Sequence, residues 1–395
     1  MHTESQVTAE SVWDTRPDIT GALRGVRVVD LSRVLAGPLC TQMLADHGAD
    51  VIKIEPPFGD ETRQLGPPFD DNGVAAYYNA VNRGKRAFAL DLNTPQDRQR
   101  LLGLLEEADV LVENFLPGTM EKWGLSYENT LAARFPRLVY CSITGFGDSG
   151  PCGGQPGYDA ILQAMCGLMS INGSAESGPT RIGIRIVDHL TAYTAMNGIT
   201  LALLHRQRSG QGQRVEATLY DTALSLLIPH ASNWLHSGQT PGLLGSAHPN
   251  IAPYDSFRAS DGAVFLGILN DVQFAKFCRA MERTGLASDP RFASNAARLN
   301  HRDALRTEIE AVFAQRCKSE LCQTLMSLGI PAGPVNTVPE ALNHPHTQHR
   351  GMRVEQAGYR GLGLPIRLHA SPGRPGDPPP FFDQHAHLRE ALPPE

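Results

Sequence analysis

One aspartate stands at a position where its carboxylate could act chemically. Asp188 lies in the stretch RIGIRIVDHLTAYTAMNGITLALLHRQ, between an apolar run and a long segment with helical character. An aspartate at a helix start can simply cap the free backbone N–H groups there. The same place offers the positive end of the helix dipole, which we expect to keep the carboxylate ionised, as a nucleophile requires. Spacing alone leaves cap and nucleophile as open alternatives.

The other chemical signals are weaker. The run GFGDSG at 145–150 follows an expected strand and matches G-x-G-x-x-G, but Pro151 and the following CGGQPG prevent the helix that a dinucleotide site needs. We interpret this run as a Gly-rich loop that could form an active-site wall. His344, His346 and His349 form the densest histidine group, and without a supporting carboxylate pattern no metal site is predicted.

Length, charge and cysteine use limit the class of protein. The chain has 395 residues, enough for two domains, and a formal net charge of −6, which argues against binding to nucleic acid or to an anionic membrane surface. Its 7 cysteines form no C-x-x-C pair and are interpreted as small buried hydrophobes in a reducing compartment. Without an apolar run of membrane length or a targeting pattern at the start, we expect a cytoplasmic protein.

Elements that could position Asp188 follow from the pattern of apolar runs. Strands are predicted at the following ranges: 25–32, 49–55, 86–92, 109–113 and 137–142. A helix with Pro38 in its first turn separates the first two, and a second begins with Thr94 as N-cap, Pro95 and Asp97. This alternation predicts an α/β fold, a doubly wound, Rossmann-like parallel sheet covered by helices.

The alternation of expected strands and helices ends at about residue 221. Two expected strands flank Asp261-Gly262, a strong hairpin signal, and helical patterns follow at 272–282 and 302–316. We interpret this region as a smaller α+β domain. Residues 329–342 read as a return linker, and the Pro-rich end as a strap with a short helix over the surface.

Taken together, these blocks resemble the family III CoA-transferases, the CaiB/BaiF group that includes formyl-CoA transferase. The resemblance runs from about residue 21 to 388. It is carried by GVRVVDLSRVLAGPLCTQMLADHGADVIKIEPPFGDETR, NRGKRAFALDL, VLVENFLPGTMEKWGL, SITGFGDSGP, GYDAILQAMCGLM, VDHLTAYTAMNGI, HRQRSGQGQRVEATLYD and GIPAGPVN. It implies that Asp188 is the nucleophile and forms an aspartyl-CoA thioester. Coenzyme A thioesters would be substrates, with no tightly bound cofactor.

The resemblance also implies which residues contact coenzyme A. These are Arg33, Leu35, Ala36, Leu90, Asn93, Asn114, Phe115, Lys122 and Tyr158. The sequence departs from some members at Pro56, where they have an arginine for the nucleotide part. Lys85 and Arg86 are alternative phosphate partners, although they could equally form a solvated basic turn.

Racemases of the same fold are the main functional alternative. They are similar in sequence but use a histidine in a GHD block, where this chain has Tyr158 before Asp159. A phenol is a poor base at neutral pH, so this departure favours transfer, with Asp159 as a hydrogen-bonding support. A catalytically silent CoA-binding protein is a more distant alternative.

The blocks GDETRQLGPPF, PTRIG and SAHPNIAPYDSF look most like members that use succinyl-CoA and short dicarboxylic acids such as glutarate, itaconate or malate. Such a substrate keeps a free carboxylate, which an arginine fork would bind. The candidates for this contact, each of which could instead form a structural salt bridge, are Arg63, Arg181, Arg185 and His248.

The resemblance finally implies the domain plan and the assembly. We expect a large CoA-binding domain at 20–225, a small domain at 226–344, and a return to the large domain at 345–395. Family members form interlocked homodimers, and we expect one here. The loop 242–250 corresponds to the family's mobile glycine loop but lacks its run of consecutive glycines.

Overall fold

The computed structural model describes residues 12–13 and 20–392. The chain divides into two compact units. The first unit holds the chain up to Cys166, Gly183–Leu226 and the chain from Pro345 onward; the second holds Gly167–Ile182 and Leu227–His344. The segment 167–182, which the sequence interpretation placed with the large domain, is thus grouped with the second unit.

A six-stranded parallel sheet forms the centre of the first unit, in the order β3-β2-β1-β4-β5-β8. Its strands are β1 (Arg27–Asp30), β2 (Asp50–Glu55), β3 (Lys85–Ala89), β4 (Val110–Glu113), β5 (Val139–Thr144) and β8 (Arg214–Thr218). The chain order reverses between β1 and β4, which creates the topological switch point of a doubly wound fold. The predicted α/β class is confirmed.

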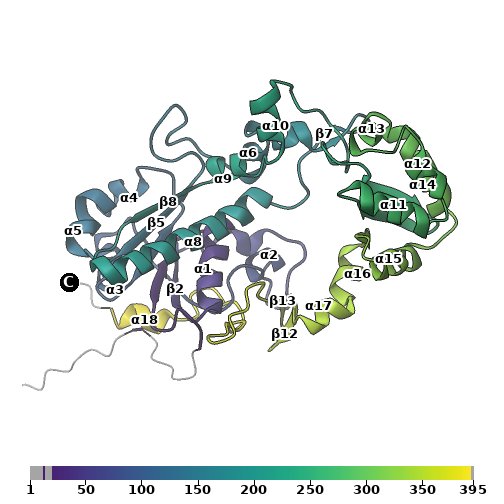
Figure 1. Cartoon of the computed structure of the whole chain (residues 1–395). Coiled ribbons are helices and arrows are strands. Elements are labelled where there is room, and N and C mark those ends of the chain that lie inside the picture. Colours follow the sequence, from purple (N-terminus) through teal and green to yellow (C-terminus); the bar gives the residue numbers. More distant parts are fainter. Residues whose placement is uncertain (1–11, 14–19, 393–395) are drawn as a thin grey trace, which may run out of the picture. The chain divides into compact units, whose positions relative to one another are not determined.

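Helices cover both faces of this sheet because its strands are apolar on both sides. Val28 and Val29 on β1 are fully buried, which is typical of parallel strands. On one side α1 (Ala36–Asp46) packs against α8 (Ile186–Ser209), as Figure 1 shows. The helix α3 (Pro95–Leu105) begins as predicted, with the Thr94 side chain accepting from the Asp97 N–H.

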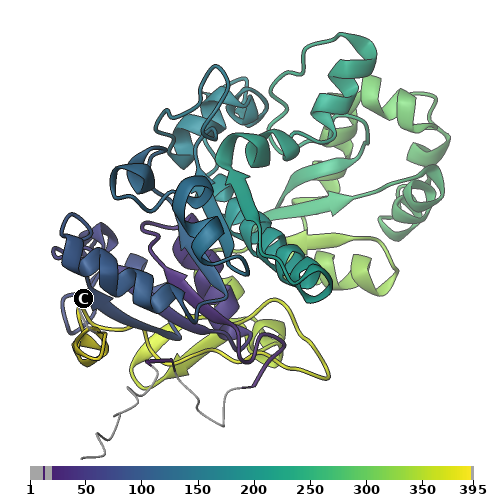
Figure 2. The same cartoon turned by 90° about the vertical axis from the view of Figure 1, so that its left-hand side faces the viewer.

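The C-terminal segment protects the edge strand β3. The backbone of Ala87 exchanges hydrogen bonds with His385, and Ala89 N–H donates to Asp383 at 2.8 Å. The helix α18 (Ala386–Glu390) then contributes Leu388 to the core beneath the sheet. Figure 2 shows this yellow segment beside the purple N-terminal strands. The predicted strap and short helix are confirmed.

Short elements complete the first unit between and after the strands. They are η1 (Glu61–Gln64), α2 (Ala76–Asn79), α4 (Thr119–Lys122), η2 (Tyr127–Leu131), α5 (Ala132–Arg134), α6 (Asp159–Met165), α9 (Leu219–Ser225), α17 (Pro345–His349), β12 (Arg353–Gln356) and β13 (Tyr359–Leu362). Among the residues that the structure describes, no helix is both long and apolar enough to cross a membrane.

The second unit is built on a three-stranded antiparallel sheet. The predicted hairpin is present as β9 (Tyr254–Ala259) and β10 (Gly262–Gly267), and β11 (Ala332–Pro334) pairs with β10. Its other elements are α7 (Leu168–Ile171), β6 (Gly173–Ser174), β7 (Gly178–Pro179), α10 (His230–Ser237), α11 (Asp271–Ala280), α12 (Thr284–Ser288), α13 (Asn295–Asn300), α14 (Arg302–Phe313), α15 (Lys318–Ser327) and α16 (Val338–Asn343). The interpretation of 329–342 as a return linker was wrong, because this segment belongs to the second unit and supplies β11 and a helix with a capping box at Thr337.

Candidate active site

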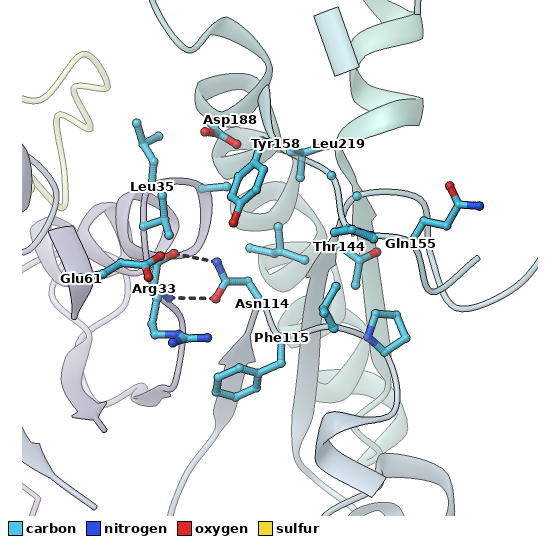
Figure 3. Close-up of a pocket in the computed structure, with 18 residues that line it drawn as sticks. Arg33, Leu35, Glu61, Asn114, Phe115, Thr144, Gln155, Tyr158, Asp188 and Leu219 are labelled. Carbon is cyan, nitrogen blue, oxygen red and sulfur yellow. Dashed lines mark hydrogen bonds between the residues drawn. The ribbon is translucent and has the colours of Figure 1, made fainter. Parts of the chain in front are cut away.

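A pocket of about 270 Å³ opens at the switch point of the parallel sheet. Its walls come from the segments that follow β1 and β4, at 33–36 and 114–117, and from the end of β5 with the residue after it, at 143–145. Parallel α/β sheets bind ligands at the carboxyl ends of their strands where the strand order reverses. Figure 3 shows this pocket with Asp188 and Tyr158 toward one end and Arg33 and Phe115 toward the other.

The segments after β1 and β4 are tied to each other. Arg33 N–H donates to Asn114 Oδ1 at 2.8 Å, and Asn114 Nδ2 donates to the Arg33 carbonyl at 2.7 Å (Figure 3). The Arg33 guanidinium lies over the Phe115 ring, 5.5 Å from its centroid, and Trp123 meets the same ring edge-on. A cation beside an aromatic face at this end suits a ligand with anionic and planar parts.

The Gly-rich loop after β5 folds back on itself and forms another wall. A Cβ atom on Gly145 would lie 2.9 Å from the Gly157 Cα, so neither position accepts a side chain without a shift of the backbone. Gly145 and Gly157 both line the pocket. Strand β5 is followed by this loop and not by a helix, which agrees with the interpretation against a dinucleotide fingerprint.

Asp188 lies in the first turn of α8 and lines the pocket, but it does not cap the helix. Arg185 is the N-cap residue, and Asp188 is three positions further on. The capping role belongs to Asp159 at the start of α6. Its Oδ2 accepts from Val187 N–H at 2.8 Å and from Asp188 N–H at 3.2 Å. The cap alternative for Asp188 was therefore wrong, and the expected supporting role of Asp159 takes a definite form.

Burial and charge make Asp188 difficult to ionise. Burial raises the pKa of the Asp188 carboxyl to about 7, and the nearby Asp159 carboxylate adds to the rise. Arg185 lowers it, but its Nη1 lies 3.9 Å from Oδ2, too far for a hydrogen bond. The sequence predicts a carboxylate kept ionised by the helix dipole. In the structure Asp159 already occupies the helix N–H groups and brings a second negative charge, so the pKa of Asp188 rises.

Tyr77 on α2 is a residue of this region that the sequence interpretation missed. The Arg185 guanidinium lies 5.1 Å from the centroid of its ring. Burial raises the pKa of Tyr77 to about 12, with a further contribution from the Asp188 carboxylate. In the described part of the chain its buried hydroxyl has no hydrogen-bond partner. Such a buried donor near the Asp188 carboxyl is a candidate ligand contact that only tertiary structure reveals, although Tyr77 does not line the pocket.

Most of the expected coenzyme A contacts come together in the pocket, namely Arg33, Leu35, Ala36, Asn114, Phe115 and Tyr158, together with Asp188. Three others do not line it. Leu90 is buried in the core, Asn93 bonds to Asp91 and Trp123, and Lys122 is exposed at the end of α4.

The candidate partners of a substrate carboxylate have different environments. Arg63 is buried in a bidentate ion pair with Glu55, at 2.6 and 2.9 Å, and donates to Tyr78 OH at 2.6 Å, which favours the structural alternative. Arg185 alone is placed beside Asp188. Arg181 and His248 belong to the second unit, where Arg302 donates to the His248 carbonyl at 2.6 Å and holds the loop 242–250.

Both alternatives for Lys85 and Arg86 were wrong. Lys85 is fully buried on β3 and pairs with Asp30 at 3.0 Å, while Arg86 pairs with Asp50 at 2.6 Å. Neither forms a solvated turn, and neither lines the pocket. No group of three or more His, Cys, Asp or Glu side chains that could hold a metal ion occurs within residues 12–13 and 20–392.

Known proteins share this architecture and these sequence blocks. Residues 23–386 match the CoA-transferase family III. A succinate--glutarate CoA-transferase of Agrobacterium fabrum is 40% identical over 93% of this chain and 95% of its own. A succinyl-CoA:mesaconate CoA-transferase of Haloarcula hispanica is 41% identical over 92% and 94%. The crystal structure of a CaiB/BaiF family protein from Brucella suis is 42% identical, with a TM-score of 0.86 over 95% of this chain and 100% of that one.

These matches show that the protein is a CoA-transferase. The chain belongs to family III of these enzymes, as its sequence blocks indicated.

Proposed function

We propose that this enzyme transfers coenzyme A from succinyl-CoA to a short dicarboxylic acid through a thioester on Asp188. The proposal rests on the position and surroundings of the Asp188 carboxyl group. Asp188 lines the pocket, its pKa is raised to about 7, and the helix N–H groups beside it are already satisfied by Asp159. A desolvated carboxylate without strong hydrogen bonds is a better nucleophile than a solvated one.

The reaction proceeds by four exchanges at carbonyl carbon. The Asp188 carboxylate attacks the donor thioester and expels the coenzyme A thiolate, which leaves a mixed anhydride. The thiolate attacks the aspartyl carbon, releases the donor as a carboxylate and forms the aspartyl thioester. The acceptor carboxylate then attacks the same carbon and expels the thiolate again. Finally the thiolate attacks the acceptor acyl carbon and frees Asp188, so that no water or redox partner is consumed.

Arg185 and Tyr77 support the choice of a dicarboxylate. A succinyl group keeps one carboxylate after the other has formed the thioester, and this charge requires a cationic or hydrogen-bonding partner. Arg185 is half-buried next to Asp188 and is held over the Tyr77 ring, and the Tyr77 hydroxyl is a donor without a partner in the described residues. We assign the free carboxylate to this pair. The names of the similar enzymes point to acceptors of the size of glutarate or mesaconate, and itaconate and malate remain candidates from the sequence.

Trapping the intermediate tests this proposal. The enzyme is incubated with succinyl-CoA alone, treated with hydroxylamine and digested for mass spectrometry. We expect a hydroxamate on Asp188 and none in the Asp188→Asn variant. A second incubation in D2O with a branched acyl-CoA tests the racemase alternative, since α-deuterium exchange without new acyl-CoA species would contradict transfer. The absence of turnover with a panel of dicarboxylic acids would favour a silent binder.

The interlocked homodimer remains a prediction. Exposed apolar side chains support it, because single-chain surfaces rarely gather large apolar residues without a partner. Leu201 and Leu204 on α8 are 66% and 47% exposed, and Trp234 and Leu235 on α10 are 51% and 72% exposed. The cytoplasmic location is likewise a prediction, consistent with 7 free cysteines.

A further inference from the structure

The turn that follows β1 holds a residue in a costly backbone conformation. Val34 has a φ of 72°, in the left-handed region, and it lines the pocket. A β-branched residue rarely adopts this conformation because its side chain crowds the backbone. Such a residue persists only where its surroundings fix the chain on either side. The turn 32–35 must therefore be held by something outside itself.

Side chains from three strands hold the two residues before Val34. Ser32 N–H donates to Asp30 Oδ1 at 2.9 Å, and the Ser32 carbonyl accepts from Lys53 Nζ at 2.7 Å. Asn114 holds the N–H and the carbonyl of Arg33 at 2.8 and 2.7 Å. Both polar backbone groups of two successive residues are thus fixed by side chains of β1, β2 and the end of β4.

Close packing adds a second constraint to the same turn. A Cβ atom on Gly37, in the first turn of α1, would lie 2.2 Å from the Ser32 Cβ. The turn therefore lies directly against α1, and the space behind it is filled. A loss of the hydrogen bonds would therefore not let the turn move toward α1.

Lys53 is itself immobilised and cannot reach a ligand. Its side chain is 0% exposed, and its Nζ lies 3.0 Å from Asp60 Oδ2, which is equally buried. Asp60 is fixed in turn by Thr62, whose N–H and hydroxyl donate to Oδ1 at 3.0 and 2.7 Å. Lys53 thus links Asp60, at the start of η1, to the Ser32 carbonyl through two contacts of its Nζ.

We propose that Lys53 is a positioning residue for coenzyme A binding, which keeps the turn 32–35 in its strained form by holding the Ser32 carbonyl. This inference rests on the proposed function in one respect, namely that the pocket binds coenzyme A. Without Lys53, Val34 relaxes toward an extended conformation and the turn moves into the pocket. Coenzyme A can then bind only when Val34 returns to its left-handed conformation, and the free energy of that change weakens binding.

The test is calorimetric binding of free coenzyme A to the full-length protein and its variants. The strain of one left-handed residue corresponds to roughly 5–30-fold in an equilibrium, so we expect Lys53→Met to weaken binding by about that factor. Val34→Gly removes the strain, because glycine adopts positive φ freely. We therefore expect Lys53→Met/Val34→Gly to recover most of the affinity that Lys53→Met loses.

Two further variants separate positioning from general loss of stability. Lys53→Met/Asp60→Asn lacks the lysine without leaving Asp60 as an unpaired buried charge, and we expect the same weakening in it. Arg83→Met removes another buried cation, which pairs with Asp46 at 2.6 Å away from the turn. Coenzyme A binding should be unchanged in Arg83→Met.

The outcomes are distinguishable. Unchanged affinity in the folded Lys53 variants would overturn the inference, and so would a loss that Val34→Gly does not recover. Weakened binding in Arg83→Met would also overturn it, because the effect would then be general. Failure of the proposed function would appear in the wild-type protein, as an absence of coenzyme A binding.

Discussion

Replacement of Asp188 by asparagine should have opposite effects on catalysis and on stability. The side chain keeps its size and loses its charge. Without a carboxylate no mixed anhydride or thioester can form, so we expect kcat to fall by more than about a thousandfold. The folded protein should at the same time become more stable above neutral pH, because an unfavourable buried charge is removed.

The size of the stabilisation follows from the pKa of Asp188. Folding raises it from 3.8 to about 7. A group with a raised pKa keeps its full contribution to stability below the unfolded value and loses it as the pH rises to the folded value. The difference of about 3 units corresponds to roughly 4 kcal/mol as an upper limit. The variant should therefore match the wild type at pH 3.5 and exceed it increasingly up to pH 8.

Urea unfolding of both proteins at pH 4, 6 and 8 measures this difference. Asp221→Asn serves as the matched control, because Asp221 occupies the same third position of α9 but is exposed. That change should cost at most about 1 kcal/mol, through the lost interaction with the helix dipole. If Asp188→Asn is no more stable at pH 8 than at pH 4, relative to wild type, the argument that Asp188 is held in an unfavourable site is wrong.

Three further predictions follow from the same geometry. Asp159→Asn removes the negative charge that helps to raise the Asp188 pKa, so the acid limb of kcat/KM should move down by about one pH unit; an unmoved limb would contradict the coupling. Tyr77→Phe should raise KM for the acceptor about tenfold, and leave the melting temperature unchanged or higher, because the lost hydroxyl is buried without a partner among the described residues; an unchanged KM would remove Tyr77 from the substrate site. Light scattering after dilution should show a dimer, and a monomer would count against the interlocked assembly.

The fold was predictable because its signals are local. Apolar runs alternating with helix starts such as Thr94-Pro95 define βαβ units, and these admit few topologies. The third strand of the small sheet was not predictable in the same way. The residues Ala332–Pro334 carry no strand pattern. They form a strand because they pair with the open edge of β10, which lies more than 60 residues earlier in the chain. The conformation of β11 is therefore determined by tertiary contacts and not by its local sequence.

The pocket walls were predictable from their positions at strand ends, but the roles of the basic residues were not. In the sequence Arg63 and Lys85 look like surface cations that could meet phosphate or carboxylate groups. In the structure each is buried against an acid on a strand of the parallel sheet: Arg63 against Glu55 on β2, and Lys85 against Asp30 on β1. A sequence shows the charge of a side chain but not its burial. Burial decides whether a cation is free to bind a ligand or is held in an ion pair within the fold.

Asp188, the proposed nucleophile, shows the same limit. Its position near a helix start predicts a carboxylate that the helix dipole keeps ionised. The partner that reverses this expectation, Asp159, lies 29 residues earlier and reaches the same N–H groups from another helix. Because Asp159 takes these donors, Asp188 is left desolvated beside a second negative charge, and its pKa rises. Asp159 therefore caps α8 and, in the proposed mechanism, leaves Asp188 as the carboxylate that reacts.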